Sequence, residues 1–133
     1  MLDAILTLAI KENKRIRDLN YSAFHSLPHS QYLKQFCTIH IDIGRGVGKT
    51  TYITENATTN DLVIVHSRNA GCDIFKKRTY LGGILWGIDG MNEVTLCNVN
   101  FVYVDEPSLL MIDLDDVYHL FAVHNPTFIL LGK

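Results

Sequence analysis

The chain has 133 residues, which is enough for one compact domain with a core of its own but not for two. Twelve Lys and Arg stand against 14 Asp and Glu, so the net charge of −2 provides no overall attraction to nucleic acid or to an anionic membrane. Any such contact has to come from a local patch of charge.

Residues 2–19 predict an amphipathic helix. Its apolar residues lie near one face of the expected helix: Leu2, Ile5, Leu6, Ala9, Ile16 and Leu19. Its basic residues crowd the later turns: Lys11, Lys14, Arg15 and Arg17. They fit either the solvated end of a packing helix or a contact with nucleic acid. The apolar start is too short to span a bilayer, so we expect no membrane association.

Three cysteines, Cys37, Cys72 and Cys97, are odd in number and scattered along the chain. They match neither a metal-ligand spacing nor a secreted disulfide framework. We therefore expect a reducing, cytoplasmic location, which would be the host cytoplasm for a viral protein. Each cysteine can equally serve as a small buried apolar residue.

Helices and strands are expected to alternate along the rest of the chain. A connector (20–28) and a short helix or turn (29–34) precede a strand (36–43). The later elements are a helix (50–56), a strand (61–66), a helix (67–80), a strand or loop (82–87), strands (93–97 and 100–105), a helix (114–123) with Asp113 as its cap, and a last strand (127–131). The pattern favours an α/β three-layer sandwich with a mainly parallel sheet.

The most informative motif runs from Ile39 to Thr51. An alternating apolar run leads into a glycine-rich loop that ends in Lys49-Thr50, in the order strand, turn and helix start. Glycines allow successive N–H groups to curl around an anion, and the helix start adds the positive end of its dipole. Lys49 is expected to reach the outer phosphates and Thr50 to hold Mg²⁺. The usual pattern has glycine at the position of Ile43. The loop fits either a phosphate-binding site or an ordinary glycine-rich turn.

A second motif places two carboxylates after an apolar strand. Phe101 to Val104 runs directly into Asp105 and Glu106, at the kind of strand end where open α/β sheets bind ligands. We expect Asp105 to bind Mg²⁺ and Glu106 to act as general base on the attacking water.

The order of these segments resembles the ATPase core of helicases and phage terminases, over roughly residues 31–133. The resemblance implies a P-loop NTPase (RecA-like) core at 31–133, with the helix and connector of 1–30 packed on it. It implies ATP and Mg²⁺ as cofactors. The implied nucleotide-binding residues are Gly44, Gly46, Val47, Gly48, Lys49, Thr50, Thr51 and, as an adenine-reading residue, Gln31. The implied catalytic residues are Glu106, Lys49 and Arg45, with Thr50 and Asp105 on the metal.

The chain departs from that family after its last strand. We expect this chain to lack the second lobe that supplies an arginine in that family, and therefore to hydrolyse ATP more slowly by roughly 10³ or more. Arg45 would act from the loop itself. Arg68 or Arg78 would act on a neighbour in a homo-oligomer, and a partner protein is the other source of such an arginine.

Three functions are consistent with these residues. The first is a minimal Mg²⁺-dependent ATPase that works on nucleic acid or a nucleoprotein complex, of viral origin by its resemblance. The second is a P-loop module that binds nucleotide or a partner without hydrolysis. The third is a phosphotransferase with a small acceptor. A guanine-reading Asn-Lys-x-Asp motif is absent from the sequence, which disfavours a GTPase.

Overall fold

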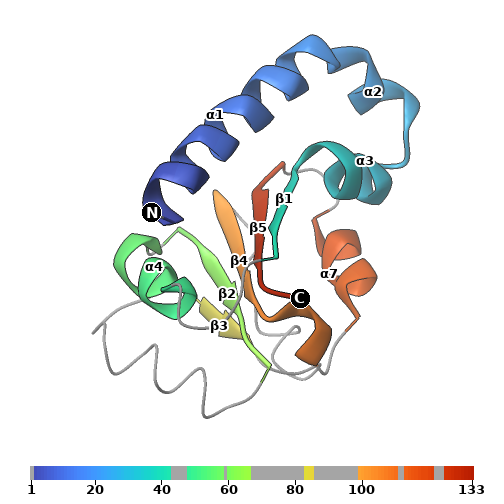
Figure 1. Cartoon of the computed structure of the whole chain (residues 1–133). Helices are drawn as coiled ribbons and strands as arrows, with labels where there is room; N and C mark the ends of the chain where they lie inside the picture. Colours follow the sequence, from blue (N-terminus) through green and yellow to red (C-terminus); the bar gives the residue numbers. More distant parts are fainter. Residues whose placement is uncertain are drawn as a thin grey trace.

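The computed structural model describes residues 2–42, 48–58, 60–66, 83–85, 99–110, 113–121 and 125–133. In these ranges the chain is an α/β protein built on a five-stranded sheet (Figure 1). The strands are β1 (Thr38–Ile41), β2 (Leu62–Ile64), β3 (Gly83–Leu85), β4 (Phe101–Asp105) and β5 (Thr127–Leu131). Their order is β1-β5-β4-β2-β3, and every neighbouring pair is parallel. The expectation of a mainly parallel sheet is confirmed.

Helices cover both faces of this sheet, an arrangement compatible with the expected three-layer sandwich. The helices are α1 (Leu2–Leu19), α2 (Tyr21–Ser26), α3 (His29–Phe36), α4 (Lys49–Asn56), the 3-10 turn η1 (Pro107–Leu109) and α7 (Leu114–Leu120). α1 and α4 pack on one face, and α3 and α7 pack on the other (Figure 1).

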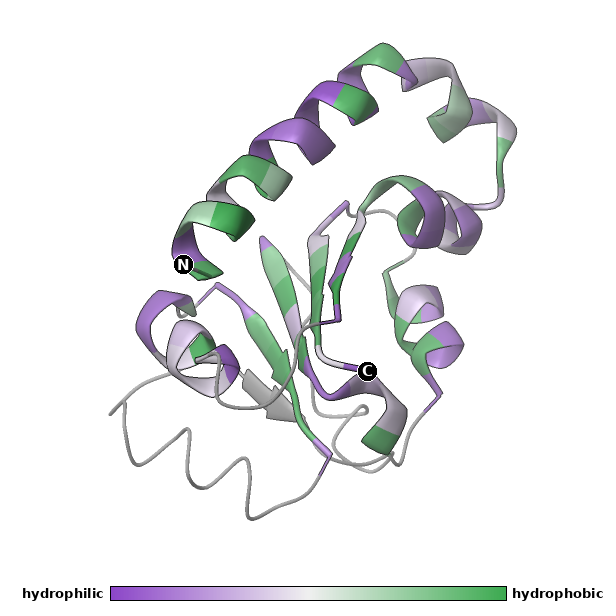
Figure 2. Cartoon of the chain, in the orientation of Figure 1, coloured by the Kyte–Doolittle hydropathy of each residue, from purple (hydrophilic) through white to green (hydrophobic). Residues whose placement is uncertain are grey.

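The central strands are mostly apolar because both of their faces are covered. In β4, Val102 and Val104 contact the α3 and α7 side, whereas Phe101 and Tyr103 contact the α1 and α4 side. Figure 2 shows the resulting green interior of the sheet. The continuous apolar run before Asp105 therefore reflects a buried central strand.

Two expectations about the first thirty residues are wrong. Residues 21–26, expected in a connector, form helix α2, because Ala23 and Phe24 find apolar partners in the core and stabilise a turn too short to show periodicity. The first helix also buries fewer of its apolar residues than expected. Leu2 and Leu6 are buried, but Ile5, Ile16 and Leu19 are 40%, 37% and 70% exposed. At 3.6 residues per turn these three positions lie about 60–120° around the helix from the midpoint of the buried pair, toward one edge of the apolar face.

The later elements agree with the sequence where the structure describes them. α7 begins after Asp113, whose side chain accepts a hydrogen bond from the Asp115 N–H at 2.9 Å, as expected of a cap. The helix expected at 67–80 and the strand expected at 93–97 lie outside the described residues. None of the helices in the described ranges has both the length and the apolar character needed to cross a bilayer.

Candidate functional site

The topology places the carboxyl ends of β1 and β4 on either side of β5, the position where open α/β sheets have their ligand crevice. The chain leaves β1 toward α4 on one face of the sheet, and it leaves β4 toward α7 on the other face. β5 lies between these two strands, and its Leu131 is in register with both Ile41 and Asp105. In open α/β sheets, such a point of divergence is where ligands bind.

Helix α4 brings Lys49 and Thr50 to this end of the sheet. Its N-cap is Gly48, which has a φ of +86°. This left-handed conformation is accessible to glycine at low cost and strained for other residues. The helix therefore starts directly at Lys49, with its first N–H groups facing away from the helix body. Thr51 is exposed on the same first turn.

Strand β4 brings the two acidic residues to the same place. Asp105 is its last residue and is only 7% exposed. Glu106 follows in a left-handed conformation, with a φ of +51°, and its N–H donates to the Leu131 carbonyl at 2.9 Å. A non-glycine residue in this region stores strain that is typical of functional sites.

Side-chain contacts join the two motifs, which lie more than fifty residues apart in sequence. Lys49 Nζ donates to Glu106 Oε1 and forms an ion pair in which the lysine is 10% and the glutamate 23% exposed. Thr50 Oγ1 donates to Asp105 Oδ2 at 3.4 Å, the long end of hydrogen-bond distances. The four residues that the sequence singled out therefore form one cluster.

Asp105 is an unusual member of that cluster. Burial raises the pKa of its carboxyl group, and the negative charge of Glu106 raises it further. Lys49, His66 and the Thr50 hydroxyl act in the opposite direction without cancelling the shift. A cation placed against Asp105 would favour the ionised form.

The residues suit a magnesium ion bound jointly with phosphates. The described residues contain no group of three or more His, Cys, Asp or Glu side chains that could hold a metal by themselves. Mg²⁺ does not need such a group, because it retains several waters and is typically bound by one or two carboxylates together with substrate phosphates. A buried carboxylate beside a threonine hydroxyl fits that mode.

Two residues at this end of the sheet, Gly132 and His66, were not predicted from the sequence. Gly132 has a φ of +104°, and a Cβ built on it would lie 2.6–2.7 Å from the Glu106 carboxylate. The side chain of Glu106 therefore rests against a backbone position without a side chain. A lone glycine directly after an apolar strand was the available signal.

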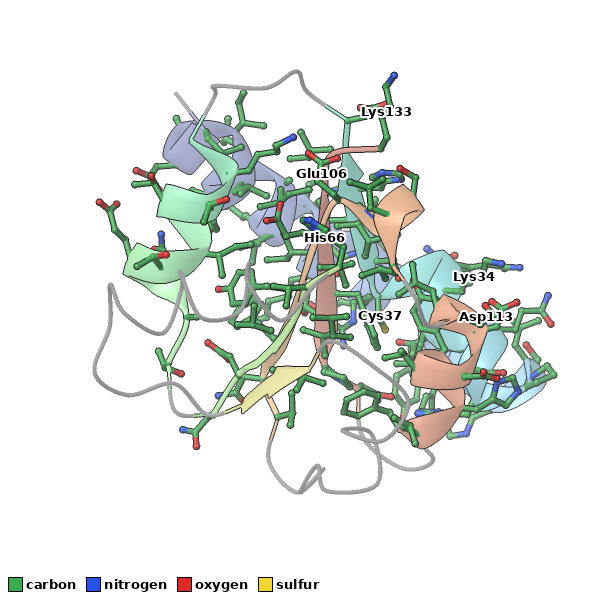
Figure 3. All side chains as sticks on the ribbon, turned by 90° about the horizontal axis from the view of Figure 1, so that it is seen from below. Lys34, Cys37, His66, Glu106, Asp113 and Lys133 are labelled. Carbon is green, nitrogen blue, oxygen red and sulfur yellow. The ribbon has the colours of Figure 1, made fainter. Side chains whose placement is uncertain are left out.

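His66 is the second such residue. It follows β2 and lies at the same end of the sheet as Glu106 (Figure 3). Its Nδ1 atom is buried and has no hydrogen-bond partner in the described part of the chain. The sequence offered no signal for it, because a histidine at a strand end is common in ordinary cores.

The other predicted residues stand apart from the cluster. Gly44, Arg45, Gly46 and Val47 lie outside the described residues, as do Arg68 and Arg78. Gln31 is exposed on α3, and no described contact joins it to the cluster. Asn125 lies before β5, at the end of the sheet opposite Asp105.

Comparisons with known proteins add no assignment. A scan against models of protein families finds none that matches, and searches of curated proteins and of solved structures find no match. The functional argument therefore depends on the geometry of this site.

Proposed function

We propose that this chain is a minimal Mg²⁺-dependent ATPase with a P-loop core, acting on nucleic acid or a nucleoprotein complex. The observation that carries the proposal is the convergence of Lys49 and Thr50 with Asp105 and Glu106 at one end of the sheet. The sequence motifs would be chance features if they lay apart. Their contact supports a single site that takes phosphates on one side and a metal on the other.

Each residue has a role that its position suits. Lys49 would neutralise the outer phosphates, and Thr50 and Asp105 would hold Mg²⁺. Glu106 would accept a proton from the attacking water. Mg²⁺ would neutralise charge on the phosphates during transfer. ATP would also replace Glu106 as the partner of Lys49, which frees the glutamate for its role as a base.

Phosphate release is the direct test of hydrolysis. The purified chain should release phosphate slowly from ATP and Mg²⁺, and Glu106→Gln should lower that rate by about 10²-fold or more. The assay should be run across protein concentration, with and without single-stranded DNA, because a neighbouring copy can supply an arginine to the site. Equal background release from both proteins would contradict the proposal.

One observation favours a second candidate, a module that binds nucleotide without hydrolysis. Glu106 is already engaged in an ion pair with Lys49, and it is held in a strained backbone conformation. A site that keeps this pair after nucleotide binding would lack a free base. Binding of Mg²⁺-ATP without turnover, even with DNA or RNA present, would select this candidate over the first.

A further inference from the structure

A cleft lies at the opposite end of the sheet from the candidate ATP site. It has a volume of about 470 Å³ and is bounded by the later turns of α1, by α2 and α3, and by the start of β4 and β5. Its size is within the range of small-molecule sites.

Two cations line this cleft, and neither has a carboxylate partner among the residues that the structure describes. The Arg17 guanidinium donates to the Thr127 hydroxyl at 3.0 Å and to the Asn125 carbonyl at 2.9 Å, and both acceptors are neutral. Lys14 forms no ion pair in the described part of the chain. The lining also contains one carboxylate, Asp18. The cleft therefore carries excess positive charge that a bound anion would offset.

Aromatic rings form much of the remaining wall. They belong to Tyr21, Phe24, Tyr32 and Phe101. Tyr21 is 67% exposed, so its ring is accessible to a ligand. Flat rings next to cations are the combination that binds nucleotides, because a base stacks on the rings while its phosphate meets the charge.

We propose that this cleft binds one nucleotide unit of a single-stranded nucleic acid. Its base would stack on Tyr21, and its phosphate would lie near Lys14 and Arg17. This inference deepens the proposed function and rests on it. A protein that acts on nucleic acid would bind a polymer in this cleft, and not a free nucleotide. The cleft and the ATP site lie at opposite ends of the strands, so each can be tested alone.

The experiment measures binding of a short fluorescent oligothymidylate by anisotropy, without ATP. Tyr21→Ala should weaken binding about five-fold or more, as expected for loss of one stacked base. Lys14→Gln should reduce the slope of log affinity against log salt by about 0.7, as expected for loss of one phosphate contact on a single strand. Lys11→Gln is the matched control, because Lys11 is exposed on the same helix but does not line the cleft.

The outcomes separate this inference from the proposed ATPase. Lys49→Ala should abolish phosphate release and leave oligonucleotide binding unchanged, whereas Tyr21→Ala should leave the rate of release without DNA unchanged. A mononucleotide that binds as tightly as the oligomer, with the same sensitivity to the variants, would support the site and identify a free nucleotide as its ligand. Absence of binding, or equal binding by Tyr21→Ala, Lys14→Gln and Lys11→Gln, would overturn the inference whether or not ATP is hydrolysed.

Discussion

Two buried aspartates at opposite ends of the sheet differ in how the protein satisfies them. Asp61, 4% exposed, lies just before β2. Its carboxylate accepts from the Thr58 N–H at 2.8 Å, from the Thr58 hydroxyl at 3.1 Å and from the Phe101 N–H at 3.1 Å. Asp105, 7% exposed, ends β4 and accepts one long hydrogen bond from Thr50 within the described residues.

The difference indicates what each carboxylate does. The Asp61 carboxylate joins the turn before β2 to the first residue of β4. Its hydrogen bonds therefore stabilise the fold. Asp105 is nearly as buried, yet its donors are too few to compensate burial, which raises its pKa. A charge that the fold does not satisfy is suited to an external partner such as a cation. The same end of the sheet holds the strained Glu106 and the His66 Nδ1 atom, which has no hydrogen-bond partner among the residues that the structure describes.

The largest effect on stability should come from Asp61→Ala. This change removes three hydrogen bonds to a charged acceptor and leaves two backbone N–H groups without a partner. We expect a loss of about 3 kcal/mol in the free energy of unfolding, measured by urea denaturation. Asp61→Asn keeps an acceptor oxygen and should lose less. Equal stability of Asp61→Ala and the wild type would show that Asp61 has no structural role.

Gly132→Ala should have the next largest effect. It places a side chain at a φ of +104° and against the Glu106 carboxylate. The backbone strain alone costs about 1–2 kcal/mol. The matched control is Gly48→Ala, which has a φ of +86° but open space around the new Cβ.

Both glycine variants should therefore lose stability, measured by urea denaturation, and Gly132→Ala should lose more. Its Glu106 side chain must also move, so phosphate release should fall further than stability alone explains. Equal losses of stability in the two variants would mean that the contact between Gly132 and Glu106 does not affect the free energy of unfolding.

A smaller effect of opposite sign is expected for Asp105→Asn in the presence of EDTA. Because the folded protein binds the Asp105 proton more tightly than the unfolded chain does, the ionised carboxylate destabilises the fold at neutral pH. The variant should therefore be more stable than the wild type at pH 7. The difference should shrink as the pH falls through the raised pKa toward the ordinary value of 3.8. A difference that grows on acidification would contradict the assignment of a raised pKa.

The sequence predicted the parts of the fold that depend on local pattern. The strand ending at Asp105 and the helix starting near Lys49 are visible as a continuous apolar run and a glycine-rich turn. Their contact followed from one rule, that carboxyl ends of parallel strands share an edge. Which strand lies between them could not be predicted, because strand order depends on pairing between distant segments.

The rest of the site depends on three-dimensional packing. Gly132 belongs to the site only because the Glu106 side chain rests on it. His66 belongs to the site only because β2 ends near Asp105. The exposed side of α1 was mispredicted for a similar reason. Apolar periodicity identifies a helix, but it does not say which part of its apolar face the sheet covers.

The central claim is that Lys49, Thr50, Asp105 and Glu106 form one site for ATP and Mg²⁺, and calorimetric titration tests it most directly. ATP should bind the wild type more tightly with Mg²⁺ than with EDTA. Lys49→Ala should weaken binding about ten-fold or more in both conditions. Asp105→Asn should remove the difference between the two conditions. Binding that does not respond to Mg²⁺ or to either substitution, or no binding at all, would contradict the account.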